Sequence, residues 1–248
     1  MHRVNSQSLR ACSRAAGVVR AAAALSLLTA CADAPLAPSH DVPLLAPASA
    51  KLGVARVEQF ANVANIWTTS ALSTRNSANA EGNVVAFRGT VEGLPLAASQ
   101  VLTITYAFSV DGHRAYDFLA TTPDGSVTDG TTFFIPLDPH QVDGTTVAAL
   151  MPAGLFRLTG GTITSVSGYV HTGDDGSRSE ARISVTFTPT APTATLHWGA
   201  HLASSNAWTS GGAAQVGNGN WQMRLNVDGT PQVKSASIQA SSITAATP

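Results

Sequence analysis

The most regular alternation of apolar and polar residues in this chain runs from Thr193 to Leu202. The apolar members share one parity, and they are Ala194, Leu196, Trp198, Ala200 and Leu202. Polar or small residues occupy the other parity. A period of two residues is typical of a strand with one buried face. The pattern therefore predicts a β-strand over the whole stretch.

Two histidines in this stretch, His197 and His201, have the i, i+4 spacing of a chelating pair on a helix. On a strand, the same spacing separates their Cα atoms by about 13 Å, at about 3.3 Å per residue. Two imidazoles that share one metal ion must instead converge to bonds of about 2 Å. We therefore expect no shared metal ion unless the strand breaks at Gly199.

Similar alternations recur through most of the chain. They predict strands at 83–91, 101–110, 114–121, 132–137, 155–158, 162–172, 180–189, 221–227 and 235–242. The pair Asp111-Gly112 predicts a tight hairpin between 101–110 and 114–121, because both residues accept positive φ. The loop 173–176 predicts a second hairpin. Near the start, Val57, Phe60 and Ala64 have helical spacing, which predicts a short helix over 53–66.

About ten short strands with frequent turn signals, and no long helix, predict an all-β fold. We expect one domain over 53–248 that forms an antiparallel β-sandwich of the immunoglobulin-like or jelly-roll type. A closed barrel is the competing architecture.

The first thirty residues have the pattern of an export signal. Four arginines precede the apolar run 21–28, and no acidic residue occurs before Asp33. The run ends in Leu28-Thr29-Ala30-Cys31, which resembles the lipobox of bacterial lipoproteins and implies lipidation of Cys31. An ordinary cleavage site beside a chance cysteine is the alternative. We expect a signal peptide at 1–30 and a disordered Pro- and Ala-rich tether at 31–52 that reaches about 60 Å when extended.

Cleavage before Cys31 changes the composition in two ways. The remaining 248 − 30 = 218 residues contain no second cysteine, since Cys12 leaves with the signal, and this excludes disulfides and thiolate chemistry. Four basic residues also leave, so the formal charge becomes 10 − 15 = −5. Phosphate backbones are bound by clustered Lys and Arg, so we expect no nucleic-acid partner.

Asp117, His201 and Arg114 form a candidate polar cluster. Aspartate is disfavoured in strands, so a compensating partner is expected for Asp117. Either Asp117 and His201 converge on a ligand, or Asp117 pairs with Arg114 or a neighbouring imidazole. The chain has no G-x-S-x-G motif. We expect no enzymatic activity, no metal and no cofactor, and we keep a hydrolase as an alternative.

Two features of the predicted loops have more than one interpretation. Trp208 lies in the Gly-, Ser- and Asn-rich stretch 203–220, where it is either a stacking platform for a sugar or a plug at the end of the sandwich. Four loop aspartates are either calcium ligands or simple turn formers, and they are Asp124, Asp129, Asp138 and Asp143.

Several longer segments resemble successive signatures of a β-rich module of secreted bacterial surface proteins. The segments are 112–119, 160–169, 198–204 with Trp208, and 221–225, so the resemblance covers roughly 65–243. The family is described by its architecture and location, and the resemblance implies an extracytoplasmic module with no catalytic residues to transfer. The chain departs from the family at Arg114, where histidine is usual, and at Ser205 and Ala207, where charged residues are usual.

These observations predict a lipid-anchored protein of the cell envelope, held to the membrane through Cys31, that acts by contact with a protein. It is either a surface or adhesion-like protein or an accessory subunit that stabilises an integral membrane complex. The alternatives are a carbohydrate-binding module that uses Trp208, with a glycan as partner, and a hydrolase.

Overall fold

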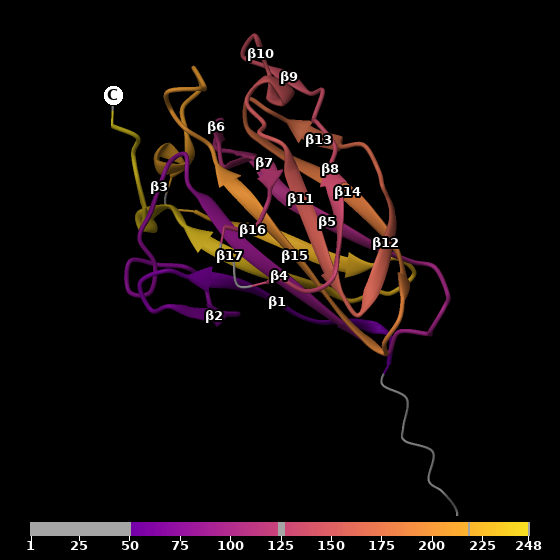
Figure 1. Cartoon of the computed structure of the whole chain (residues 1–248). Coiled ribbons are helices and arrows are strands. Elements are labelled where there is room, and N and C mark those ends of the chain that lie inside the picture. Colours follow the sequence, from indigo (N-terminus) through magenta and orange to yellow (C-terminus); the bar gives the residue numbers. More distant parts are fainter. Residues whose placement is uncertain (1–50, 124–126, 218, 248) are drawn as a thin grey trace, which may run out of the picture. The chain divides into compact units, whose positions relative to one another are not determined.

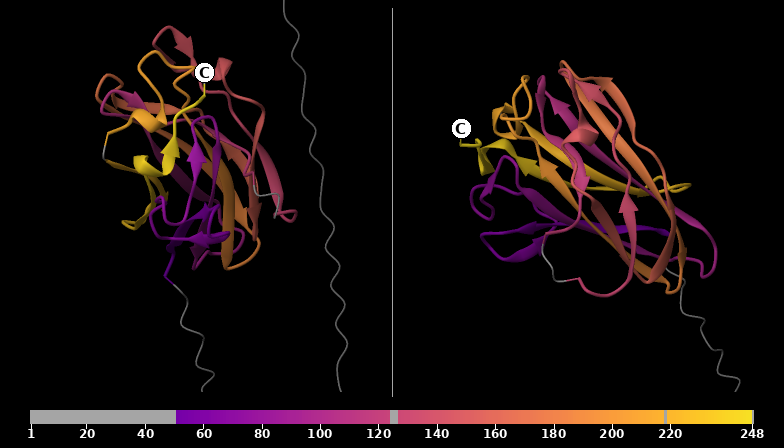
Figure 2. Two further views of the ribbon diagram at one scale, coloured as in Figure 1. Left: turned by 90° about the vertical axis from the view of Figure 1, so that its left-hand side faces the viewer. Right: turned by 45° about the horizontal axis from the view of Figure 1, so that its top comes forward.

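The computed structural model describes residues 51–123, 127–217 and 219–247, and it shows an all-β antiparallel sandwich. Two seven-stranded sheets face each other (Figures 1 and 2). The predicted signal, Cys31 and all of the predicted tether except Lys51 and Leu52 lie outside the described residues.

The first sheet follows the order β2-β1-β4-β15-β11-β8, and β7 also pairs with β15. Its strands are β1 (Gly53–Ala61), β2 (Ile66–Thr68), β4 (Val84–Glu92), β7 (Tyr116–Ala120), β8 (Thr131–Ile135), β11 (Gly154–Thr159) and β15 (Thr193–Leu202). β15 has the bounds predicted from its alternation. It lies beside β4 over its length, while β11 and β7 share its other edge.

The second sheet follows the order β12-β14-β5-β16-β17, with β13 on β14 and β6 on β5. Its strands are β5 (Gln100–Val110), β6 (His113–Arg114), β12 (Gly161–Val166), β13 (Val170–Asp174), β14 (Arg178–Pro189), β16 (Asn220–Val227) and β17 (Val233–Gln239). β12 and β13 pair with successive parts of β14, which confirms the second predicted hairpin.

Shorter elements complete the described residues. β9 (Gln141–Val142) and β10 (Thr145–Thr146) form a small hairpin, and β3 (Asn79–Ala80) pairs in parallel with β18 (Ile243–Thr244). Single 3-10 turns occupy Val147–Ala149, Ala213–Gln215 and Ala240–Ser242.

The core lies between the two sheets. Trp198 of β15 stacks on Phe87 of β4, with ring centroids 5.8 Å apart and planes 14° from parallel. Gly89 of β4 lets the two sheets approach each other closely, because a Cβ atom there would lie 2.2 Å from Cδ2 of Leu225 in the opposite sheet. Close packing of this kind explains why β15 keeps a strict alternation.

The predicted helix over 53–66 is wrong, because β1 occupies most of this segment. A β-bulge between Val54 and Arg56 shifts the register against β4. The shift places two buried residues, Val54 and Val57, three positions apart. The three residues behind the helix prediction instead lie in different surroundings: Val57 is in the core, Phe60 meets Trp67 edge to face, and Ala64 is exposed in the turn after β1.

The first predicted hairpin is correct only at its turn. Asp111 and Gly112 have φ values of 52° and 80°, as expected. Only the short β6 pairs with β5, and the chain then crosses to the first sheet, where β7 pairs with β15. The prediction of a return strand over 114–121 is wrong beyond Arg114, because β14 and β16 occupy the two edges of β5.

Candidate functional site

The end of the sandwich where β6, β9, β10 and β13 lie (Figure 1) holds a group of buried and partly buried polar side chains. The segments that supply them are far apart in the sequence: β6 and β7, the loop around β9 and β10, β13 with the turn after it, and the end of β15 with the loop after it. We call this group the loop-end cluster, and it consists of Arg114, Asp117, Asp138, His140, Asp143, His171, Asp175, His201 and Trp208.

Asp117 is fully buried and both of its carboxylate oxygens have a partner. Nδ1 of His201 lies 2.7 Å from Oδ1, and Nε1 of Trp208 donates to Oδ2 at 3.0 Å. The His201 ring also stacks on Phe118, with centroids 4.3 Å apart. A carboxylate fixed in this way orients an imidazole and ties the loop after β15 to β7.

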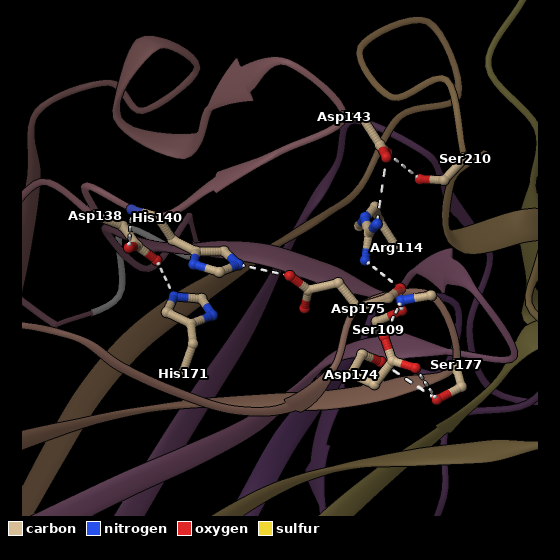
Figure 3. Close-up of polar contacts among 11 residues, drawn as sticks. Ser109, Arg114, Asp138, His140, Asp143, His171, Asp174, Asp175, Ser177 and Ser210 are labelled. Carbon is tan, nitrogen blue, oxygen red and sulfur yellow. Dashed lines mark hydrogen bonds and ion pairs between the residues drawn. The ribbon is translucent and has the colours of Figure 1, made fainter.

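Arg114 does not join Asp117, although both were candidates for one cluster. Its side chain is 2% exposed, and Nη1 donates to the backbone oxygen of Asp175 at 2.9 Å. Nη2 lies 3.5 Å from the carboxylate of Asp143, which also accepts a hydrogen bond from Ser210. Figure 3 shows Arg114 between these two partners. The hydrogen bond from Ser210 is the main cause that lowers the pKa of Asp143, and Arg114 lowers it further.

A second buried carboxylate, Asp138, holds a pair of histidines that the sequence analysis did not identify. Oδ2 of Asp138 lies 2.8 Å from Nε2 of His171, and Oδ1 accepts the backbone N–H of His140 at 3.0 Å. The two imidazoles stack with centroids 3.8 Å apart and planes 9° from parallel. Nε2 of His140 then reaches Asp175 at 2.7 Å (Figure 3). The chain of contacts therefore joins the β9 loop to the β13–β14 turn.

Phe108 of β5 lies at the centre of the loop-end cluster. The rings of His140, His171 and Trp208 meet it edge to face, and the guanidinium of Arg114 lies 5.4 Å from its centroid. Aromatic contacts of this geometry are favourable beyond the area that they bury. One apolar ring therefore supports both halves of the polar cluster.

The prediction that Trp208 offers a stacking platform is wrong, because the side chain is only 2% exposed. Its N–H group is bonded to Asp117 and its ring packs on Phe108. A sugar needs an open aromatic face, and this indole has none. Trp208 instead closes the end of the sandwich, which was the alternative interpretation.

The described loop aspartates that were considered as calcium ligands have separate partners. Asp138 binds imidazole and Asp143 binds guanidinium and hydroxyl groups, while Asp124 lies outside the described residues. Over 51–123, 127–217 and 219–247, no group of three or more His, Cys, Asp or Glu side chains is placed to hold a metal ion. His197 and His201 lie four positions apart on one continuous strand, so they do not converge on an ion.

A polar groove of about 690 Å³ lies on the outer face of the second sheet. Side chains from β5, β14 and β16 line it, among them Thr103, Arg182, Ser184 and Asn226. Among the described residues, Arg182 belongs to no ion pair. This groove is open, in contrast to the closed loop-end cluster.

Comparisons with models of known protein families and with curated proteins find no match. In the described part of the chain, no helix is long and apolar enough to span a membrane.

Proposed function

We propose that this protein is a lipid-anchored, extracytoplasmic and non-catalytic domain that acts by contact with a protein at the cell envelope. The loops that the loop-end cluster holds together form its recognition surface. The domain serves either as a surface protein or as an accessory subunit braced against a membrane complex. The resemblance of Leu28–Cys31 to a lipobox supports the anchor.

The observation that carries this proposal is the cross-linking of four separate segments at the loop end by buried polar contacts. Asp117, Asp138 and Arg114 are almost completely buried, and each joins segments that are distant in the sequence. A surface held in one arrangement before binding loses little conformational entropy when a partner docks. The carboxylates and imidazoles of the cluster are engaged with one another, which favours a structural role over catalysis.

Photo-crosslinking in intact cells tests the contact surface. A photo-crosslinking residue at the exposed position Thr209 is expected to give one discrete adduct at the envelope. The matched control is the exposed Thr190, in the turn before β15, which should give none. Equal adducts from both positions, or no adduct from Thr209, would contradict recognition through the loop end.

Metabolic labelling with palmitate tests the anchor separately. We expect label in the parent chain and none in Cys31→Ala, which should also leave the membrane fraction. Label that persists in Cys31→Ala would place the lipid elsewhere, and no label in the parent chain would remove the anchor from the proposal.

A second candidate function, glycan binding, is supported by the groove on the second sheet and no longer by Trp208. Hydroxyl and amide groups of Thr103, Ser184 and Asn226 line it beside the unpaired guanidinium of Arg182. Polar groups of these kinds bind sugar hydroxyls. Saturable binding on a glycan array that is lost in Asn226→Ala would favour this function, and an Asn226→Ala variant that binds glycan as well as the parent would exclude the groove.

A further inference from the structure

The outer face of the first sheet carries two parallel rows of polar side chains that cross four neighbouring strands. Cross-strand neighbours in one row are Glu58, Arg88, His197 and Arg157, and in the next row Arg56, Thr90, Thr195 and Thr159. Residues opposite each other on one face of a sheet lie close enough to interact. The two rows therefore form one continuous polar surface.

Within these rows, one carboxylate positions two guanidinium groups. Oε2 of Glu58 lies 2.9 Å from Nε of Arg56 and 2.7 Å from Nε of Arg88, and Oε1 accepts from Nη2 of Arg88 at 3.0 Å. The hydrogen bond from Arg88 is the main cause that lowers the pKa of Glu58, so the carboxylate is ionised at neutral pH. Arg88 is further held by Trp67, whose ring centroid lies 4.6 Å from the guanidinium carbon.

This arrangement leaves donor groups for a ligand. Arg56 bonds to Glu58 only through Nε. The described residues offer no hydrogen-bond partner to the two Nη groups of Arg56. The Arg56 side chain is 52% exposed and that of Arg88 is 29% exposed. Guanidinium edges of this kind bind the oxygens of phosphate or carboxylate in pairs.

A pocket of about 190 Å³ lies where the two rows meet. Six residues line it, and they are Arg56, Arg88, Thr90, Thr159, Thr195 and His197. Glu58 is not among them, so its charge lies behind the guanidinium groups. The pocket therefore presents cationic side chains and an imidazole beside three threonines.

The charge of the two rows is opposite to that of the chain. They contain three arginines and one glutamate, a formal surplus of 3 − 1 = +2, whereas the whole chain has a formal charge of −1. In the loop-end cluster every carboxylate has a partner within the protein, whereas on this face the guanidinium groups outnumber the carboxylates. An anion is the ligand that such a surplus attracts.

We propose that this pocket binds a phosphate group. Two guanidinium groups and three hydroxyls line the pocket from four strands. The Thr159 hydroxyl donates to the backbone oxygen of Thr195, and the Thr90 and Thr195 hydroxyls bond to each other, which leaves one O–H of that pair for a ligand. Donors arranged in this way in three dimensions suit a tetrahedral anion better than a planar carboxylate. The group is either inorganic phosphate or the phosphate of a lipid headgroup, because both present the same oxygens. This proposal does not depend on the loop-end contact surface.

Equilibrium dialysis of the full chain in detergent against radiolabelled inorganic phosphate tests the pocket, with ionic strength held constant by chloride. We expect saturable binding that weakens by about tenfold in Arg56→Gln and in Arg88→Gln, since hydrogen bonds to charged groups have this strength. Arg75→Gln removes the same charge from an exposed position outside the pocket and should bind like the parent.

Further variants and competitors keep the test decisive. Thr195→Val retains every charge and should weaken binding several-fold, which covers the case in which Arg88→Gln fails to fold. Acetate at equal concentration should not displace phosphate. Absence of saturable binding, an equal loss in Arg75→Gln, or displacement by acetate would each overturn the proposal.

Flotation with vesicles distinguishes the two sources of phosphate, and it uses Cys31→Ala so that an anchor does not contribute. Binding to vesicles that carry phosphatidic acid, which is lost in Arg56→Gln and is absent with phosphatidylcholine alone, assigns the pocket to lipid headgroups with an accessible phosphate. Phosphate binding in dialysis without any flotation assigns it to the free anion.

Discussion

The loop-end cluster and the arginine pocket of the first sheet both concentrate charged side chains, but they do so in opposite ways. In the cluster, Asp117 and Asp138 are fully buried and each is satisfied by a partner within the protein. In the pocket, Arg56 and Arg88 share the carboxylate of Glu58 and remain partly exposed. Charges that satisfy one another hold a structure together, whereas charges in surplus on an accessible face remain available to a ligand.

Removing Asp117 should have the largest effect on stability. Asp117→Ala leaves the Trp208 N–H and the His201 imidazole without their acceptor at a buried position. We expect the free energy of unfolding to fall by about 3 kcal/mol, measured by urea denaturation. Asp111→Asn, at an exposed turn position with φ of 52°, is the control and should change it by less than about 0.5 kcal/mol. Similar losses in both would show that burial of Asp117 has no special role.

Arg114→Met should have a smaller effect, because one of its partners, Asp143, is 23% exposed and regains water. We expect the free energy of unfolding to fall by about 2 kcal/mol. The stability of Arg114→Lys should lie between that of Arg114→Met and that of the parent. The same replacement at the exposed Arg178 is the control. If Arg114→Met and Arg178→Met are equally stable, the buried guanidinium does not hold the loops.

Acid should weaken the ion pairs and hydrogen bonds before it affects the apolar core. Burial acts to raise the pKa of Glu81, but hydrogen bonds from Ser205, Ala246 and Ala214 outweigh it, and the net pKa is lowered. A lowered folded-state pKa gives stability that is present above the unfolded value of about 4.3 and is lost as pH falls through the folded value.

The free energy of unfolding, measured by urea denaturation across pH, should therefore fall as pH decreases from about 5 to 3. Glu81→Gln removes the titrating group and should show a shallower decrease over the same range. An identical pH dependence in the parent and in Glu81→Gln would exclude Glu81 as a contributor.

Arg56→Gln should have the smallest effect on stability, within about 0.5 kcal/mol, because exposed ion pairs contribute little. It should nevertheless weaken phosphate binding by about tenfold. If Arg56→Gln lost stability but still bound phosphate, the pocket would stabilise the fold instead of binding a ligand. Urea denaturation and dialysis on the same preparation measure both quantities.

The alternation of residues predicted most strands of the core. β15 has its predicted bounds, and the Asp111-Gly112 turn has the predicted backbone conformation. Both are local properties: a strand with one buried face requires a period of two, and a tight turn requires residues that accept positive φ. The helix predicted over 53–66 failed because the pairing of β1 with β4, which is not a local property, determines the conformation of this segment.

Only the tertiary structure determined which polar side chains meet. Asp138 and His171 are 33 positions apart, and the row through Glu58, Arg88, His197 and Arg157 joins four strands from separate parts of the chain. β14 and β16 pair with the two edges of β5. The segment after Arg114 therefore lies in the other sheet, where β7 pairs with β15 and Asp117 lies beside His201. Sequence pattern determines which face of a strand is buried. Which side chains meet is determined by strand order and register, and these are set by packing between segments that are distant in the chain.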